Sequence, residues 1–221
     1  MEIKVVRQIL EWNEDKSDEI KEDLIAKNVF MINVMGSPGA GKTSLITTLI
    51  KELEPKYRSG VIEGDVAGQI DADKMAAMGI PVVQLNTDGA CHIEAMSVQH
   101  ILPLFDLDSV DVLFIENIGN LVCPAEFNIG EDYRLAVLSV PEGDDKVEKY
   151  PLLFATTDVL AINKYDMKSY FDFDDKKVEE KSLDINPRVK TFRVSSRDGS
   201  GIPELAAFLG SQIENKLKKQ S

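Results

Sequence analysis

The sequence has few cysteines, few histidines and no long apolar run. Its 221 residues include two cysteines, two histidines and one tryptophan. Two cysteines cannot build a disulfide framework, which argues against a small secreted domain held together by disulfides. No apolar run approaches the roughly 18–20 residues of a membrane-spanning helix. The N-terminal stretch MEIKVVRQILEWNEDKSDE is charged throughout, unlike a signal peptide. We therefore expect a cytoplasmic protein with no membrane partner.

Basic residues are also in short supply. Lys and Arg number 25 against 38 Asp and Glu, which gives a formal net charge of −13. A chain of this charge repels nucleic acid and anionic lipid, so we expect no nucleic-acid partner, and any phosphate-binding site must be local. The length suits one large domain or at most two small ones.

Apolar runs and amphipathic stretches alternate along the chain. The run at 29–35 is unbroken, as is typical of a strand covered on both faces. The alternation predicts an α/β fold, a mostly parallel sheet with helices on both faces and ligands beyond the carboxyl ends of the strands. We expect an N-terminal helical segment, 1–28. The apolar face of its helix has a polar middle, so we expect it to dock loosely. We expect one domain over 29–221. The expected strands are 29–35, 60–63, 81–85, 111–116, 135–140, 158–163 and 189–194, and the expected helices 3–27, 43–53, 70–78, 92–102, 147–154 and 202–216.

A glycine-rich segment, GSPGAGKT at 36–43, follows the first strand. Two glycines five residues apart, followed by Lys and Thr, are the pattern of a phosphate-binding loop. Backbone N–H groups and the N-terminus of the next helix point at the anion. Lys42 adds a charge for the β and γ phosphates, and the Thr43 hydroxyl is a ligand for Mg²⁺. The residues expected to contact the nucleotide here are Gly36, Ser37, Pro38, Gly39, Ala40, Gly41, Lys42, Thr43 and Ser44.

The predicted strand at 158–163 ends at Asn163, which begins the segment Asn-Lys-Tyr-Asp. This segment resembles the guanine-reading element of GTPases. One Asp166 carboxylate accepts hydrogen bonds from both the N1–H and the N2 amine of guanine, whereas adenine offers an acceptor at N1. Such a pair is worth about 1–3 kcal/mol of discrimination. We expect Asn163 to brace the loop and Lys164 to cover the base. A backbone N–H near Ser195 and Ser196 would meet the guanine oxygen.

Acidic residues follow two other predicted strands. Glu116 ends the strand at 111–116, and Gly119 comes three residues later, where GTPases usually have Asp-x-x-Gly. We expect Glu116 to bind Mg²⁺ directly or through water, and the Gly119 N–H to sense the γ-phosphate. Asp65 or Asp71 would complete the Mg²⁺ site or orient the attacking water. No glutamine stands at a water-positioning place, which predicts slow intrinsic hydrolysis.

Both cysteines and one histidine fall in predicted loops at the same rim. Cys91 and His92 are adjacent at the expected start of a helix, and Cys123 follows Gly119 by four residues. Thiolates and imidazole suit Zn²⁺ or Ni²⁺ better than Mg²⁺. One chain offers three ligands, so a water or a second subunit would complete the site. The alternative is two buried free cysteines and a surface histidine. His100, about 12 Å further along a helix, would serve only a second ion.

Six stretches within 32–166 together resemble the HypB family, the nickel-insertion GTPases of NiFe-hydrogenase maturation. They are INVMGSPGAGKTSL, EGDVAGQIDADK, QLNTDGACHIEA, ENIGNLVCPAEF, SVPEGDDKVEKYP and AINKYD. The resemblance implies a SIMIBI-class P-loop GTPase that forms a homodimer when GTP is bound, with a metal site of Cys91, His92 and Cys123. It also implies that Lys149, rather than Lys146, reaches the γ-phosphate of the partner subunit.

The resemblance further implies that nickel passes to the hydrogenase large-subunit precursor with the help of a nickel-delivery partner chaperone. Many members of the family carry an N-terminal metal motif. Residues 1–35 here contain neither Cys nor His, so we expect no separate N-terminal nickel site.

Three other interpretations fit parts of the sequence. A urease-accessory GTPase would share the chemistry, but its usual Cys-Pro-His triplet is absent, since Cys123-Pro124 is followed by Ala125. A P-loop small-molecule kinase is disfavoured by the Asn-Lys-Tyr-Asp segment. A non-catalytic metal carrier that uses GTP only as a structural ligand would have the same motifs and would differ in phosphate release.

Overall fold

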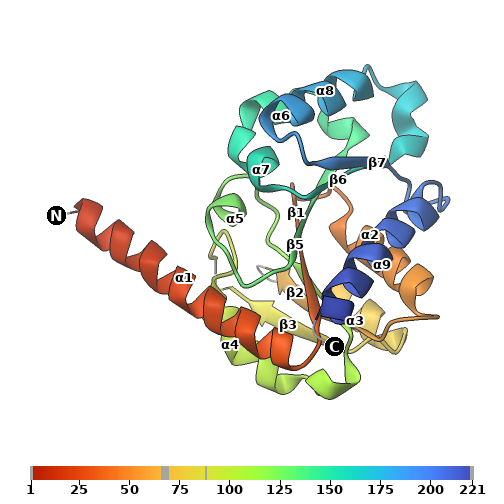
Figure 1. Cartoon of the computed structure of the whole chain (residues 1–221). Helices are drawn as coiled ribbons and strands as arrows, with labels where there is room; N and C mark the ends of the chain where they lie inside the picture. The colour runs from red at the N-terminus through yellow and green to blue at the C-terminus, as the bar shows by residue number, and fades with distance from the viewer. Residues whose placement is uncertain (1, 66–69, 88, 220–221) are drawn as a thin grey trace.

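The computed structural model describes residues 2–65, 70–87 and 89–219, and its centre is a parallel β-sheet (Figure 1). The seven strands pair in the order β3-β2-β4-β1-β5-β6-β7, and every pairing is parallel. Their bounds are β1 Phe30–Gly36, β2 Ser59–Asp65, β3 Val82–Asn86, β4 Val112–Glu116, β5 Tyr133–Ser139, β6 Val159–Asn163 and β7 Lys190–Arg193. The predicted α/β class is confirmed.

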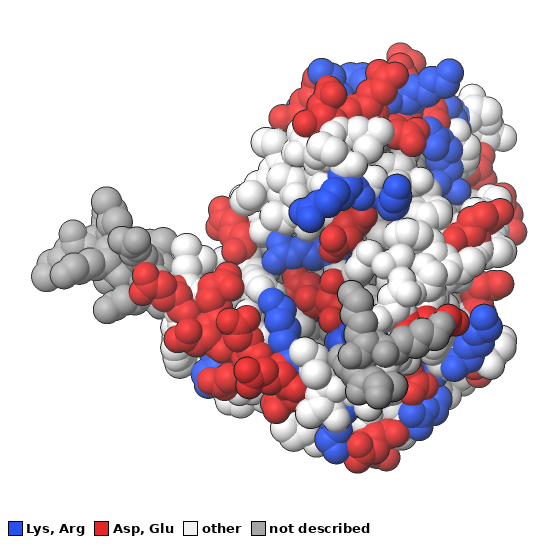
Figure 2. Space-filling view, viewed as in Figure 1, with Lys and Arg blue, Asp and Glu red and all other residues white. Residues whose placement is uncertain are grey.

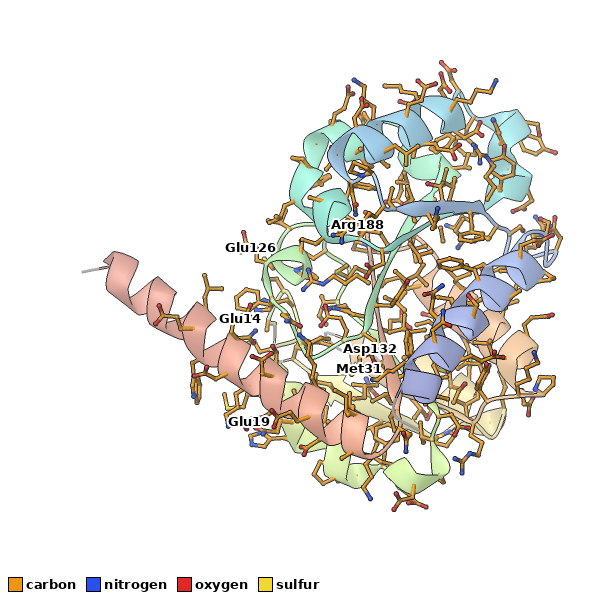
Figure 3. The ribbon with its side chains drawn as sticks, viewed as in Figure 1. Glu14, Glu19, Met31, Glu126, Asp132 and Arg188 are labelled. Carbon is orange, nitrogen blue, oxygen red and sulfur yellow. The ribbon has the colours of Figure 1, made fainter. Side chains whose placement is uncertain are left out.

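The sheet is covered by helices on both faces, which explains the unbroken apolar strands. Every residue of β1, β4 and β6 is buried. Successive side chains of a strand point to opposite faces. Ile32 and Val34 pack with α2 and α9, whereas Met31 packs on the opposite face in the same cluster as residues of α1 and α4. Figure 3 shows Met31 beside Asp132, whose carboxylate accepts a hydrogen bond from the Met31 N–H at 2.9 Å.

Nine helices occur among the described residues. They are α1 Glu2–Ala26, α2 Lys42–Leu53, α3 Ile70–Ala77, α4 Ala95–Ile101, α5 Cys123–Glu126, α6 Lys146–Lys149, α7 Pro151–Thr156, α8 Asp175–Ile185 and α9 Ile202–Lys219. Short 3₁₀ turns lie at Leu102–Leu104, Leu107–Ser109, Val140–Glu142 and Tyr165–Tyr170. Among these described helices, none combines the length and apolar composition that crossing a bilayer requires.

The first half of α1 extends away from the body, and the second half lies against α4 (Figure 1). Ile20 and Leu24 are fully buried there. The polar Ser17 is also fully buried, and Asn13 is nearly so. The Asn13 side chain donates to Asn128 O at 2.7 Å and accepts from the Ala95 N–H at 3.0 Å. The expectation that the polar middle docks loosely is therefore wrong, because its amide is paired with backbone. Figure 2 shows acidic side chains gathered along the outer side of α1.

Two predicted helices have different bounds. The helix expected from 92 begins only at Ala95, because Glu94 is extended, with φ of −97° and ψ of 156°. Cys91 and His92 therefore lie in a loop. The helix expected over 147–154 is divided into α6 and α7 at Pro151, which has no N–H to continue the helix. Neither the short α5 nor the longer α8 was among the predicted helices.

Candidate functional site

The phosphate-binding loop joins the end of β1 to the start of α2. Gly39 and Gly41 have φ of 76° and 93°, left-handed values that favour glycine. A Cβ at Gly41 would lie 2.6 Å from Asn163 Nδ2, so glycine is also needed for space. Lys42 is 7% exposed, and its ammonium group curls back to donate to Gly36 O and Ser37 O, both at 3.2 Å. The loop thus forms an anion cradle with a lysine across it.

The segment after β4 touches this loop directly. A Cβ at Gly119 would lie 2.8 Å from the Pro38 nitrogen, and one at Gly36 would lie 2.5 Å from Val137 O. Asn120 forms an antiparallel bridge with Gly36. The backbone of Gly119 therefore contacts the phosphate loop so closely that residue 119 cannot carry a side chain.

Oxygen donors for a hard cation meet at the N-terminus of α2. The Thr43 hydroxyl donates to Glu116 Oε1 at 2.8 Å. Glu116 is 7% exposed, and the register of β2 and β4 sets the similarly buried Glu63 beside it. Hydroxyl and carboxylate oxygens are the ligands that Mg²⁺ prefers, so these residues fit that ion. Asp65 ends β2 and Asp71 lies in α3, but the side chains of both lie outside the described residues.

The Asn-Lys-Tyr-Asp segment leaves β6 toward the phosphate loop. Asn163 Nδ2 donates to Ala40 O at 3.0 Å, and its Oδ1 accepts from Ser196 Oγ at 3.2 Å, which braces both loops. Lys164 takes a left-handed φ of 54° and donates to Gly39 O at 2.7 Å. Asp166 Oδ1 accepts from Ser195 Oγ at 2.9 Å.

Two cavities meet over these residues. One, of about 590 Å³, lies over the phosphate loop and Glu116. The other, of about 380 Å³, is lined by Asn163, Asp166 and Ser196 among others. Both are lined by Gly41, Ser44 and Lys164. The arrangement is a trough with phosphate-binding groups at one end and base-reading groups at the other.

The cysteines and His92 come together beside this trough. The two Sγ atoms are 3.0 Å apart, and Cys91 Sγ lies 3.6 Å from His92 Nδ1. One ligand atom from each of the three residues falls within 4.8 Å of the others. Both cysteines are free, Cys91 is exposed, and Cys123 is partly buried. Two sulfurs and an imidazole at this separation suit Zn²⁺ or Ni²⁺.

Neighbouring residues hold this cluster in place. His92 stacks on Phe127 with ring centroids 4.0 Å apart. Asn120 Nδ2 donates to Cys91 O at 3.2 Å, and Asn120 Oδ1 accepts from the Val122 N–H at 2.8 Å. Asn120 therefore ties the Cys91 loop to the Cys123 loop. No spacing rule in the sequence indicated either Phe127 or Asn120.

The protonation of the cluster couples metal binding to proton release. Burial lowers the pKa of His92 from its usual range, partly opposed by the charges of Glu94 and Glu126, so the imidazole is neutral near pH 7. The hydrogen bond to Cys123, together with burial, raises the pKa of the Cys91 thiol. A metal ion bound here must therefore release thiol protons.

Two predicted residues lie apart from these clusters. His100 is exposed on α4 and is not part of the Cys91–His92–Cys123 group. Because α4 begins after His92, the expected helical spacing between the two histidines is wrong. Lys149 ends α6 with 58% of its side chain exposed, and it pairs with Asp145 at 2.5 Å. Lys146 also approaches Asp145, at 3.6 Å.

Comparison with known proteins decides the family. Residues 30–193 match the family model described as CobW/HypB/UreG, nucleotide-binding domain. The chain is 39% identical over 216 residues to the hydrogenase maturation factor HypB of Azotobacter vinelandii, covering 98% of this chain and 71% of that protein. It is 38% identical over 210 residues to the probable hydrogenase maturation factor HypB of Methanocaldococcus jannaschii, covering 95% of each. The chain belongs to the HypB family.

The resemblance noted from the six sequence stretches is thereby confirmed. The crystal structure of HypB from Helicobacter pylori in complex with nickel aligns with a TM-score of 0.88 at 35% identity, covering 93% of this chain and 96% of that one. In this HypB-family chain, the region matched by the family model includes the phosphate loop, the Cys91–His92–Cys123 cluster and Asn163–Asp166.

Proposed function

We propose that this protein is a GTP-hydrolysing metallochaperone that assists nickel insertion into a NiFe-hydrogenase precursor. The observation that carries the proposal is the contact between the two sites. Asn120 bridges the phosphate loop through its backbone, and its side chain binds the Cys91 loop. Relatives named hydrogenase maturation factor HypB, and one solved with nickel, support nickel as the cargo.

In this proposal the trough binds GTP. Asp166 reads the guanine edge, and Asn163 braces the phosphate loop. Lys164 covers the base, and Lys42 contacts the phosphates. Thr43 and Glu116, with Asp65 or Asp71, would hold Mg²⁺. That ion, when bound, neutralises charge that develops on the phosphates. The Gly119 N–H senses the γ-phosphate. We expect turnover to be slow.

Cys91, His92 and Cys123 bind the cargo in this proposal, as Ni²⁺ in delivery and as Zn²⁺ or Ni²⁺ at rest. Three ligands leave a tetrahedral ion incomplete, so a water or a second subunit supplies the remainder. A homodimer formed with GTP bound would also bring Lys149 of one subunit to the other subunit's γ-phosphate. A partner chaperone would help to deliver nickel, and the hydrogenase large-subunit precursor would receive it.

Phosphate release tests the enzymatic half. The purified protein should release phosphate from GTP and not from ATP, and Lys42→Ala should abolish the release. Lys51→Ala, on the same helix but exposed, is the matched control and should behave as wild type. Binding of GTP without phosphate release would instead support a metal carrier that uses GTP as a structural ligand.

Nickel titration tests the cargo half. Cys91→Ala, Cys123→Ala and His92→Ala should each remove high-affinity nickel binding while GDP binding persists. His100→Ala is the histidine control, because His100 is exposed and outside the cluster. Wild-type nickel affinity in the Cys123 variant would overturn the assignment of the site.

A further inference from the structure

A chain of polar side chains, three of them buried and one partly buried, runs beneath the proposed metal cluster, and the functions proposed above do not use it. It consists of Asn117, Asn33, Glu131 and Arg134, here called the loop-bridging network. Asn33 is fully buried, Asn117 is 1% exposed and Glu131 is 7% exposed. Arg134 and Asn33 are paired in the register of β5 and β1.

One end of the network holds the loop that carries His92. Asn117 directly follows Glu116, and its Oδ1 accepts from the Ile93 N–H at 3.3 Å and from the Ile118 N–H at 2.9 Å. Those two donors fix the orientation of the amide, so Asn117 Nδ2 must face Asn33. It donates to Asn33 Oδ1 at 3.1 Å.

The other end holds the loop that carries Cys123. Asn33 Nδ2 donates to Glu131 Oε1 at 3.3 Å, and Arg134 Nε donates to the same oxygen at 2.5 Å. The two Arg134 terminal nitrogens donate to Ala125 O and Phe127 O, each at 3.1 Å. The guanidinium thus caps the end of α5, which begins at Cys123, and it fixes the backbone of Phe127, on which His92 stacks.

Such a network is expensive unless it is complete. Buried polar groups must all be paired, and an apolar core of similar volume is often at least as stable. Here the orientation of each amide is set by its neighbour. The network joins the His92 loop to the Cys123 loop, which are separate in sequence. Its contacts reach Ile93, one residue from His92, and Ala125, two residues from Cys123. That placement suits a role in holding the two loops.

We propose that the loop-bridging network sets the separation of the His92 and Cys123 loops, so that Asn33, Asn117, Glu131 and Arg134 are positioning residues for the metal site. The inference rests on the proposed function, because it assigns a role toward nickel. Removing groups that orient metal ligands typically costs about 10- to 100-fold in metal affinity. Because Asn117 follows Glu116, the network also begins where the nucleotide site ends.

Arg134→Lys is the direct test, because lysine keeps the charge beside Glu131 but cannot bind both carbonyls of the α5 loop. Nickel affinity is measured by chelator competition, and the thiolate-to-nickel charge-transfer absorption reports the ligand geometry. We expect affinity to fall about 10- to 100-fold and the absorption band to shift, with GDP affinity and the melting transition retained. Arg58→Lys is the matched control, because Arg58 likewise joins a carboxylate, Asp111, to a backbone carbonyl, Asp108 O.

Asn33→Ser interrupts the loop-bridging network at its middle with a smaller polar side chain and should give the same nickel defect. This variant decides the matter if Arg134→Lys does not fold. A folded variant of either kind with wild-type nickel affinity and absorption overturns the inference and leaves the proposed function standing. Absence of nickel binding in the wild-type protein overturns both.

Discussion

The nucleotide trough and the metal cluster lie side by side but are built differently. The trough is made from segments that continue directly from strands β1 and β6, and its own residues bond to one another, as when Lys42 donates to Gly36 O and Asn163 donates to Ala40 O. The proposed metal ligands lie in or just after loops and depend on side chains outside the cluster, such as Asn33 and Arg134. A site of the first kind tolerates change in the rest of the molecule, whereas one of the second kind responds to it.

That difference gives the metal cluster its sensitivity to nucleotide in our account. Gly119 contacts the phosphate loop at Pro38, Asn120 bridges Gly36, and the Asn120 side chain holds the Cys91 loop. A γ-phosphate that shifts the segment after Glu116 would therefore move the ligands of the second site. Coupling of this type is reciprocal, so nickel must alter nucleotide affinity by the same factor.

The largest expected effect separates the two sites completely. Gly41→Ala should abolish nucleotide binding and leave nickel binding intact, because its Cβ would lie 2.6 Å from Asn163 Nδ2. Gly79→Ala is the matched control, since Gly79 has a φ of +78° with nothing within 4 Å of the added Cβ. Both variants should lose about 1–2 kcal/mol of stability from the left-handed backbone. Calorimetric titration with GDP distinguishes them, and equal GDP affinity would contradict the steric argument.

The contrast also explains what the sequence could and could not predict. The phosphate loop and the Asn-Lys-Tyr-Asp segment were located correctly because each is a contiguous motif at a strand end. Cys91, His92 and Cys123 were grouped correctly for a similar reason, since carboxyl ends of parallel strands share one edge.

Local pattern failed where long-range contacts decide the structure. The helix expected from 92 starts later because Glu94 is extended, in a loop that Asn117 holds through the Ile93 N–H. The polar middle of α1 docks firmly because Asn13 reaches Asn128 and Ala95. Neither contact leaves a periodic or spacing signal, and the same holds for Arg134 and Glu131.

An intermediate effect is expected for base selection within the trough. Asp166→Asn keeps an oxygen for the Ser195 hydroxyl but replaces the second guanine acceptor with a donor. The preference for GDP over ADP should fall by about 1–3 kcal/mol. Competition binding with both nucleotides measures it, with the exposed Asp172→Asn as control. An unchanged preference would remove Asp166 from base recognition, and nickel affinity without nucleotide should stay constant throughout.

The smallest effect is expected at the contact between the sites. Asn120→Ala removes the bonds to Cys91 O and the Val122 N–H while leaving all three metal ligands and the phosphate loop residues in place. The coupling between nickel and GTP-analogue binding should fall by about 1 kcal/mol of a typical 1–3 kcal/mol. Asn215→Ala serves as control, because Asn215 is exposed on α9. Full coupling in the Asn120 variant would place the connection elsewhere.

The central claim is that one segment, Glu116 to Cys123, serves both sites. Equilibrium dialysis of the wild-type protein with nickel, in the presence of Mg²⁺ with a non-hydrolysable GTP analogue or with no nucleotide, tests it most directly. We predict nickel dissociation constants that differ by about 5-fold or more between the two conditions. Equal dissociation constants would contradict the account and leave two adjacent but independent sites.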